Sequence, residues 1–168
     1  MLEAVKKTFD ILEEKGITKD FLYKNAEQEE QNKYNISLQT LCDKLSIKIV
    51  YDDNLVNEKG EKISGYSDVV KGTIFINSSE VGERMRFTLG HELYHILNNQ
   101  DEERNENNKF SENELNANAF SAELLMPEDI LVKKINDWGL DVERLAIYFK
   151  VSIPAMFYRL TNLGFLLK

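Results

Sequence analysis

The chain has 168 residues, of which 42% are hydrophobic and 30% are charged, and it contains two prolines and one cysteine. This length and composition are typical of a globular protein with one domain and a substantial core. The formal net charge of −8 repels phosphate groups, so direct nucleic-acid binding is not expected. No apolar run reaches the length of a membrane span, so no membrane partner is expected either.

Two further features predict a cytoplasmic location. Residues 1–7 lack the basic and then apolar pattern of a secretory signal. Cys42 is the only cysteine and cannot form an internal disulfide, which suits a reducing compartment. Cys42 lies on the apolar side of a helical pattern, so we interpret it as a small core residue.

Residues 1–35 are predicted to form a helical N-terminal segment. Four apolar residues recur there at helical spacing, namely Leu2, Val5, Phe9 and Leu12. Gly16 follows them as a C-cap. The polar run at residues 27–33 favours a solvated helix or a connector.

Residues 36–135 are predicted to form the central unit. Ser37 is expected to cap a helix through Leu45, and the alternating pattern at residues 47–51 predicts a strand. Residues 63–70 and 72–77 predict two more strands, which meet in a tight turn. A small sheet therefore precedes the helix that begins near Ser78 or Ser79 and is expected to run to residue 98 or 99.

Both histidines of the chain fall within this last helix, in the string His91-Glu92-Leu93-Tyr94-His95. On a helix, these two histidines lie about 40° apart, with Glu92 in the same arc. Two imidazoles one turn apart can share a Zn²⁺ ion, and the neighbouring carboxylate then reaches a water rather than the metal. Four apolar residues lie on the opposite face and are expected to pack into a core, namely Met85, Leu89, Leu93 and Ile96.

Catalytic zinc takes three protein ligands, and with no third histidine the remaining ligand should be an acid. The helix predicted at residues 111–127 supplies Glu114, and Asn118 one turn later could hydrogen-bond a ligating histidine. Spacing leaves alternatives open, because Glu114 could instead close a capping box with Ser111. Three other acids could also be the ligand, namely Asp101, Glu112 and Glu123. Four residues are expected to form the apolar stripe of this helix, namely Leu115, Ala119, Ala122 and Met126. Residues 100–108 are predicted to form an exposed loop.

Residues 86–95, together with the second block at residues 114–127, resemble the ImmA/IrrE family of metallopeptidases over roughly residues 36–165. The resemblance implies that His91, His95 and Glu114 bind one zinc ion per chain and that Glu92 is the catalytic acid/base. Asn116 and Ser121 depart from the family pattern, but neither matches a ligand position.

The fold expected is α+β and zincin-like, of the gluzincin type, with a small and mostly antiparallel sheet packed on the active-site helix and helical segments at both ends. The resemblance also implies a function. It predicts a zinc-dependent endopeptidase that cleaves a specific protein, a helix-turn-helix repressor of a mobile element, prophage or stress regulon. An extended substrate could add to the sheet along residues 72–77. Three tyrosines could stabilise the oxyanion, namely Tyr66, Tyr94 and Tyr148.

Residues 136–168 have the rhythm of a helix-turn-helix, with Ser152 as the N-cap of the second helix and Gly164 after its end. A DNA-reading helix needs several bases and amides, and this one presents only Arg159 among aromatic and apolar neighbours. We therefore expect a packing or substrate-docking element. Two alternative functions stay open: a zinc-binding protein that sequesters a repressor without cleaving it, and a DNA-binding regulator that uses these helices.

Overall fold

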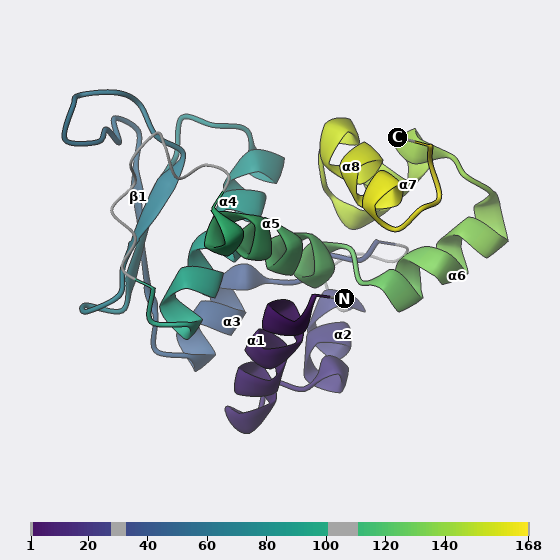
Figure 1. Ribbon diagram of the computed structural model, residues 1–168, viewed down its shortest axis with the longest axis horizontal. Helices are drawn as coiled ribbons and strands as arrows, with labels where there is room; N and C mark the ends of the chain where they lie inside the picture. The colour runs from purple at the N-terminus through teal and green to yellow at the C-terminus, as the bar shows by residue number, and fades with distance from the viewer. Residues whose placement is uncertain (1, 28–32, 101–110, 168) are drawn as a thin grey trace.

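The computed structural model describes residues 2–27, 33–100 and 111–167 (Figure 1). Residues 28–32 of the predicted polar run and residues 101–108 of the predicted loop lie outside this part. The helices and strands of the described part are α1 Glu3–Glu14, α2 Lys19–Glu27, α3 Leu38–Lys44, β1 Lys48–Asp52, β2 Gly65–Asp68, β3 Thr73–Asn77, α4 Gly82–Leu97, α5 Glu112–Leu125, α6 Glu128–Trp138, α7 Val142–Phe149 and α8 Ile153–Asn162. None of these helices has the length and apolar character that crossing a bilayer requires.

The three strands form one mixed sheet with the order β1-β3-β2. β3 pairs with β1 in parallel and with β2 in antiparallel orientation. The α+β class is therefore confirmed, but the sheet is not mostly antiparallel as predicted. Because β3 is hydrogen-bonded on both sides, residues 72–77 offer no free edge to a substrate strand. The edge strands are β1 and β2.

α4 carries both histidines and begins later than predicted. Its N-cap is Val81, not Ser78 or Ser79. The reason is a tight turn after β3, in which the Asn77 side-chain oxygen accepts hydrogen bonds from the backbone N–H of Ser79 (3.0 Å) and from its hydroxyl (2.6 Å). The polar groups of Ser79 are thereby used in the turn and do not reach the helix N-terminus.

α4 and α5 lie against each other at very close range. The ideal Cβ position at Gly90 is 2.6 Å from the Ser121 hydroxyl oxygen, so a side chain there would collide with α5. Ser121 is fully buried and donates a hydrogen bond to the Phe87 carbonyl oxygen (2.8 Å). This contact fixes how the two helices are aligned. It therefore sets which side chains face one another where the last turns of α4 meet the first turn of α5.

The buried face of α5 differs from the predicted one. Ala117, Phe120 and Leu124 are at most 1% exposed, whereas Leu115 is 52% exposed. Ala119 and Ala122, which were also expected in the core, are only half-buried. Of the predicted stripe, Met126 alone is fully buried. The helix carries apolar residues on two faces. Contact with α4 buries the face that contains Ala117, Phe120 and Leu124 rather than the predicted face.

The N-terminal helices cover the same core from the opposite side. α1 forms as predicted, and the Phe9 ring packs on Phe120 of α5 with ring centroids 5.0 Å apart. Ser37 caps α3 by accepting a hydrogen bond from the backbone N–H of Thr40. Cys42 is fully buried, so its assignment to the core is confirmed.

The C-terminal helices α6, α7 and α8 lie at the far end of the molecule from the sheet (Figure 1). Ser152 caps α8 through the backbone N–H of Ala155, as predicted. Arg159 turns inward from α8, donating to the Met126 carbonyl oxygen and pairing with Glu123 of α5. Arg159 and Glu123 are 9% and 6% exposed, so this buried ion pair fastens α8 to α5.

Candidate metal site

His91 and His95 lie one turn apart on α4, with their rings turned toward each other. Their Nε2 atoms are 3.2 Å apart, and the residues are 9% and 3% exposed. Leu89 and Leu93 on the other side of α4 are buried in the core, and Met85 and Ile96 pack against it, as the sequence predicted. This packing holds the two histidines in place.

Glu114 joins them from the first turn of α5. One carboxylate oxygen lies 3.1 Å from Nε2 of His95, and the other lies 3.3 Å from Nε2 of His91. The Ser111 hydroxyl caps the helix by accepting a hydrogen bond from the Glu114 backbone N–H. Glu114 therefore takes part in the cap through its backbone, while its side chain points to the imidazoles.

Two of the other acids considered as ligands do not share this geometry. Glu123 pairs with Arg159 in the interior, and Glu112 is exposed. Asp101 lies outside the described residues. In the described part of the chain, His91, His95 and Glu114 are the group whose ligand atoms all lie within 4.8 Å of one another, so together they could hold a metal ion.

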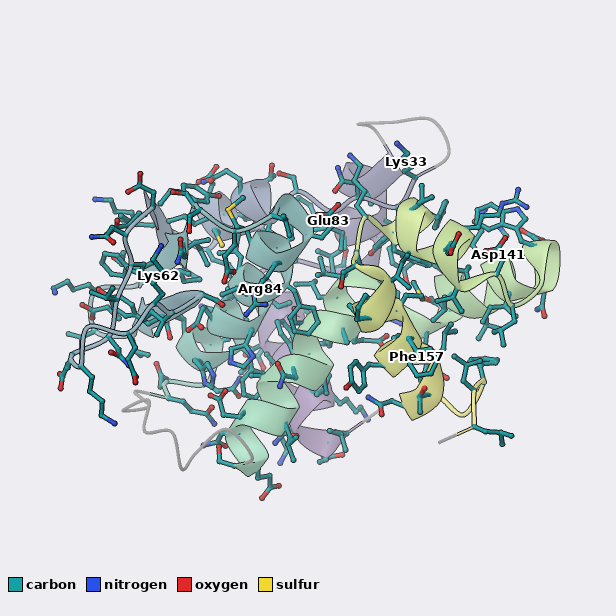
Figure 2. The ribbon with its side chains drawn as sticks, turned by 90° about the horizontal axis from the view of Figure 1, so that it is seen from above. Lys33, Lys62, Glu83, Arg84, Asp141 and Phe157 are labelled. Atoms are coloured by element: carbon teal, nitrogen blue, oxygen red, sulfur yellow. The ribbon has the colours of Figure 1, made fainter. Side chains whose placement is uncertain are left out.

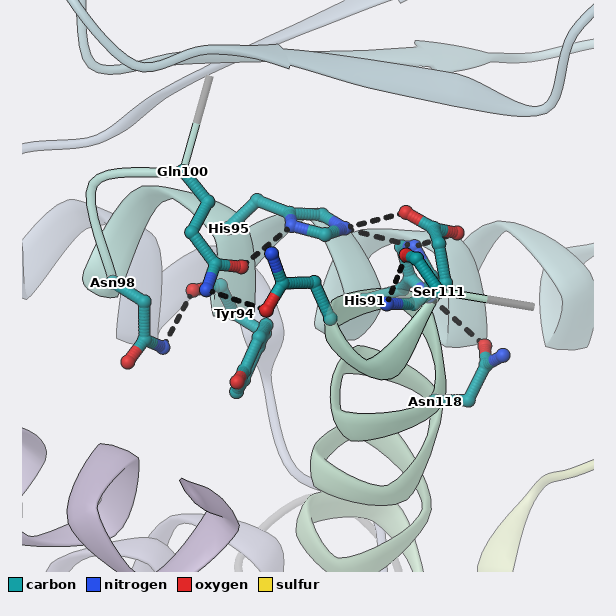
Figure 3. A network of polar contacts seen from close by, with 9 residues as sticks. His91, Tyr94, His95, Asn98, Gln100, Ser111 and Asn118 are labelled. Carbon is teal, nitrogen blue, oxygen red and sulfur yellow. Dashed lines mark hydrogen bonds and ion pairs between the residues drawn. The ribbon is translucent and has the colours of Figure 1, made fainter. Parts of the chain in front are cut away.

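Two amide side chains orient the imidazoles from behind (Figure 3). The side-chain oxygen of Asn118 lies 2.9 Å from Nδ1 of His91, as expected from its position one turn after Glu114. The side-chain oxygen of Gln100 lies 3.3 Å from Nδ1 of His95. The amide nitrogen of Gln100 donates to the Asn113 side-chain oxygen (3.1 Å), which fixes the direction of its amide group.

These partners determine which ring atoms carry hydrogen. An amide oxygen only accepts, so Nδ1 of each neutral ring is the donor and each Nε2 presents a lone pair. The two lone pairs of His91 and His95 thus face each other and the Glu114 carboxylate. Three electron-pair donors at such short range repel one another unless a cation or a proton lies among them.

The surroundings of Glu114 favour its ionised form. Burial by itself would raise the pKa of the Glu114 carboxyl, but hydrogen bonds to His91 and His95, and the positive charge of these rings when protonated, outweigh it. The net effect lowers the pKa of Glu114 well below its ordinary value of 4.5. The carboxylate is therefore ionised, as a metal ligand must be.

Glu92, the predicted acid/base, also lies on α4. It follows His91 directly on α4 and is only 1% exposed. A carboxylate so deeply buried is a rare feature in proteins and is often functional. Its role as acid/base stays a prediction.

The contact of Gln100 with His95 was not predicted from the sequence, because residues 100–108 were interpreted as an exposed loop. Asn99 adopts a left-handed conformation (φ 51°) and reverses the chain at the end of α4. The Gln100 backbone N–H can then donate to the His95 carbonyl oxygen at 2.9 Å, and the Gln100 side-chain oxygen reaches Nδ1 of His95. The signal available was the Asn98-Asn99 pair after the last helical turn, since asparagine tolerates this conformation.

The three tyrosines considered for the oxyanion lie in different environments. Tyr94 is 2% exposed, and its ring lies edge-on to His95 at 5.7 Å. Tyr66 stacks on Phe75 within the sheet. Tyr148 packs against Trp138 among the C-terminal helices.

An α+β fold with a small mixed sheet beside such a helix pair is typical of zincin-like domains. The model of the IrrE N-terminal-like domain, Peptidase_M78, matches residues 42–161, and the chain belongs to this family of metallopeptidases. The resemblance to ImmA/IrrE proteins is therefore confirmed.

Among solved structures, the chain is similar to a Mycobacterium tuberculosis transcriptional regulator, with a TM-score of 0.60 and 14% sequence identity. The similarity covers 96% of this chain and 47% of the regulator, so the chain spans about half of that protein's length. At this identity the likeness shows the fold. No curated protein matches the chain.

Proposed function

We propose that the protein is a zinc-dependent endopeptidase, with His91, His95 and Glu114 as the metal ligands and Glu92 as the acid/base. The single observation that carries this proposal is the convergence of two imidazole lone pairs and one carboxylate on a common point. Such a cluster is unfavourable by itself and becomes favourable around a divalent cation.

The donor set and its dimensions fit zinc. Tetrahedral zinc with nitrogen and oxygen ligands at about 2.0–2.1 Å requires ligand atoms about 3.3 Å apart. The two Nε2 atoms are 3.2 Å apart, and the two oxygens of Glu114 lie one 3.1 Å from Nε2 of His95 and the other 3.3 Å from Nε2 of His91. Two histidines and one glutamate are also the ligands of a known class of catalytic zinc site, which leaves a fourth position open.

When bound, zinc would act as a Lewis acid that activates water and polarises the scissile carbonyl. Glu92 accepts the proton from the attacking water and delivers it to the leaving amine nitrogen. Asn118 and Gln100 hold the imidazoles in the tautomer that presents Nε2. The core packing behind α4 keeps these groups in register, which lowers the cost of reorganisation during reaction.

The proposed substrate is a helix-turn-helix repressor of a mobile element, prophage or stress regulon in the cytoplasm. Membership of the IrrE-like family supports this proposal. The net charge of −8 also suits a partner with a basic, DNA-binding surface. Cleavage at one site would release transcription.

The test is incubation of the zinc-loaded protein with repressors encoded near its gene, followed by mass spectrometry of the products. Wild type should give one cleavage site, and Glu92→Gln should bind zinc normally and give none. Loss of cleavage with retained metal identifies Glu92 as the acid/base. If Glu92→Gln still relieves repression in cells, the protein acts by sequestration, and the peptidase proposal is wrong.

The DNA-binding alternative has little support in α8. Arg159 is the one basic residue of that helix, and its guanidinium is engaged with Glu123 and the Met126 carbonyl oxygen. A buried and paired guanidinium is not available to phosphates or base edges.

A further inference from the structure

A large cleft lies between α4, α5 and α8, next to the candidate metal site. Its volume is about 1290 Å³, which exceeds the range of about 300–1000 Å³ typical of small-molecule pockets. Figure 2 looks onto this region, with α5 between α4, which carries Arg84, and α8, which carries Phe157. A cleft of this size suits a segment of polypeptide.

One wall of the cleft is the outer face of α5. Leu115, Ala119 and Ala122 all line it, at the spacing that places side chains on a single helix face. Leu115 is 52% exposed and the alanines are half-buried. This is the stripe that the sequence predicted for the core, and it is apolar although it faces the cleft.

The opposite wall is α8. Tyr158 lines the cleft and is 69% exposed, so a large aromatic ring is available to an occupant. The next residue, Arg159, forms the buried pair with Glu123 that fastens α8 to α5. The wall is therefore held at a fixed distance from α5.

The cleft adjoins the candidate metal site, although none of the three candidate ligands lines it. Asn118 lines the cleft, and its side-chain oxygen also accepts the hydrogen bond from Nδ1 of His91. Leu115 directly follows Glu114. A chain lying in the cleft would therefore pass close to the candidate metal ligands, which favours substrate over an unrelated partner as the occupant.

The charges at the cleft favour a basic occupant. Arg84 pairs with Glu80 at 3.0 Å, and Arg159 pairs with Glu123, so both arginines of the lining are neutralised. Two exposed acids also line the cleft, Glu83 and Glu128, and within the described residues neither forms an ion pair. The remaining charge at the rim is negative.

From these observations we infer that the cleft binds the substrate segment beside the scissile bond and selects apolar side chains flanked by lysine or arginine. This inference rests on the proposed peptidase function. It adds a substrate class to that function, because the metal ligands alone set no preference for the neighbouring residues.

The test uses full-length, zinc-loaded Glu92→Gln protein and three fluorescein-labelled peptides of equal length. One peptide has leucine and phenylalanine in the centre and lysines at both ends. The second keeps the lysines but has serine and glycine in the centre, and the third keeps the apolar centre but has glutamates at the ends. Fluorescence anisotropy should show the first peptide binding at least about 10-fold more tightly than either other peptide.

Leu115→Asp and Ala119→Asp should each weaken binding of the first peptide by at least about 10-fold. Neither site is fully buried, so both variants are expected to fold. Ile147→Asp is the matched control, because Ile147 is a 66% exposed apolar residue on a helix and does not line the cleft. It should bind all peptides as the parent does.

Equal binding of the first two peptides, or unchanged binding by both Asp variants, would overturn the proposed apolar preference. Equal binding of the first and third peptides would overturn the basic preference. Hydrolysis by the wild-type protein is measured separately with the repressor substrates. Selective binding without any hydrolysis would leave the cleft assignment standing and refute the peptidase, and hydrolysis without selective binding would do the reverse.

Discussion

A carboxylate oxygen of Glu114 on α5 lies 3.1 Å from Nε2 of His95 on α4, so the site is complete only when these two helices are packed together. Replacing Glu114 by Gln removes the negative charge at nearly constant shape. We expect zinc affinity to fall by more than about 100-fold, a larger loss than changes behind the ligands produce. Competition with a chromogenic chelator measures it.

Glu112→Gln is the matched control, because it removes a charge from the same helical turn at an exposed position. It should bind zinc as the wild type does. Equal losses in both variants would mean that general charge, rather than coordination by Glu114, governs affinity.

Gln100→Ala should weaken zinc binding by about 10–100-fold, because the His95 ring loses the acceptor that fixes its tautomer. Gln100→Glu keeps an acceptor oxygen and should retain most of the affinity. Chelator competition measures the zinc affinity of both variants. The comparison separates the loss of the hydrogen bond that positions His95 from a general disturbance at the C-terminal end of α4. Equal affinity of Gln100→Ala and wild type would refute the role of Gln100.

Gly90→Ala should lower the free energy of unfolding by about 1–2 kcal/mol. The added Cβ meets the Ser121 hydroxyl oxygen at 2.6 Å, and overpacking of this kind outweighs the better helix propensity of alanine. In a Ser121→Ala background the same substitution should be much less harmful. Urea denaturation of the two single variants and the double variant gives the coupling. Additive effects would show that Gly90 and Ser121 do not meet.

Cys42 provides a test of the core that is independent of the site. Burial, with a smaller contribution from Asp43, raises the pKa of the Cys42 thiol from 9.0 to about 12. The native thiol keeps its proton in the range from pH 9 to 12, whereas the unfolded thiol loses it there. The unfolding free energy therefore falls as the pH rises above 9, by at most about 1.4 kcal/mol per pH unit from this group.

The stability difference between wild type and Cys42→Ala should accordingly be constant below pH 9 and narrow above it. Urea denaturation at several pH values measures this difference. A constant difference up to pH 11 would show that the thiol is accessible to water in the native protein. Native Cys42 should also react far more slowly with thiol reagents at pH 8 than the unfolded chain does.

The sequence identified the three candidate ligands because the position of each depends on local helical geometry. His91 and His95 are one turn apart whatever surrounds them, and Ser111 marks where α5 begins and hence where Glu114 lies. The sequence left several acids open as the third ligand. Among the acids in the described part of the chain, the structure brings the side chain of Glu114 to the imidazoles, through the close contact between Gly90 on α4 and Ser121 on α5.

Features that depend on distant contacts were not predictable in the same way. α5 has apolar residues on two faces, and burial of Phe120 rather than Leu115 is decided by contacts with α1 and α4. The central place of β3 depends on pairing with β1 across a long connection, which local alternation does not encode. Gln100 reaches His95 because of the backbone turn at Asn99.

The most direct test of the central claim is the metal content of the purified full-length protein, measured by elemental mass spectrometry. We predict one zinc ion per chain in the wild type and in Glu92→Gln, and almost none in His95→Ala. A wild-type protein that binds no zinc after incubation with the ion, or a His95→Ala protein that binds it equally well, would contradict the account.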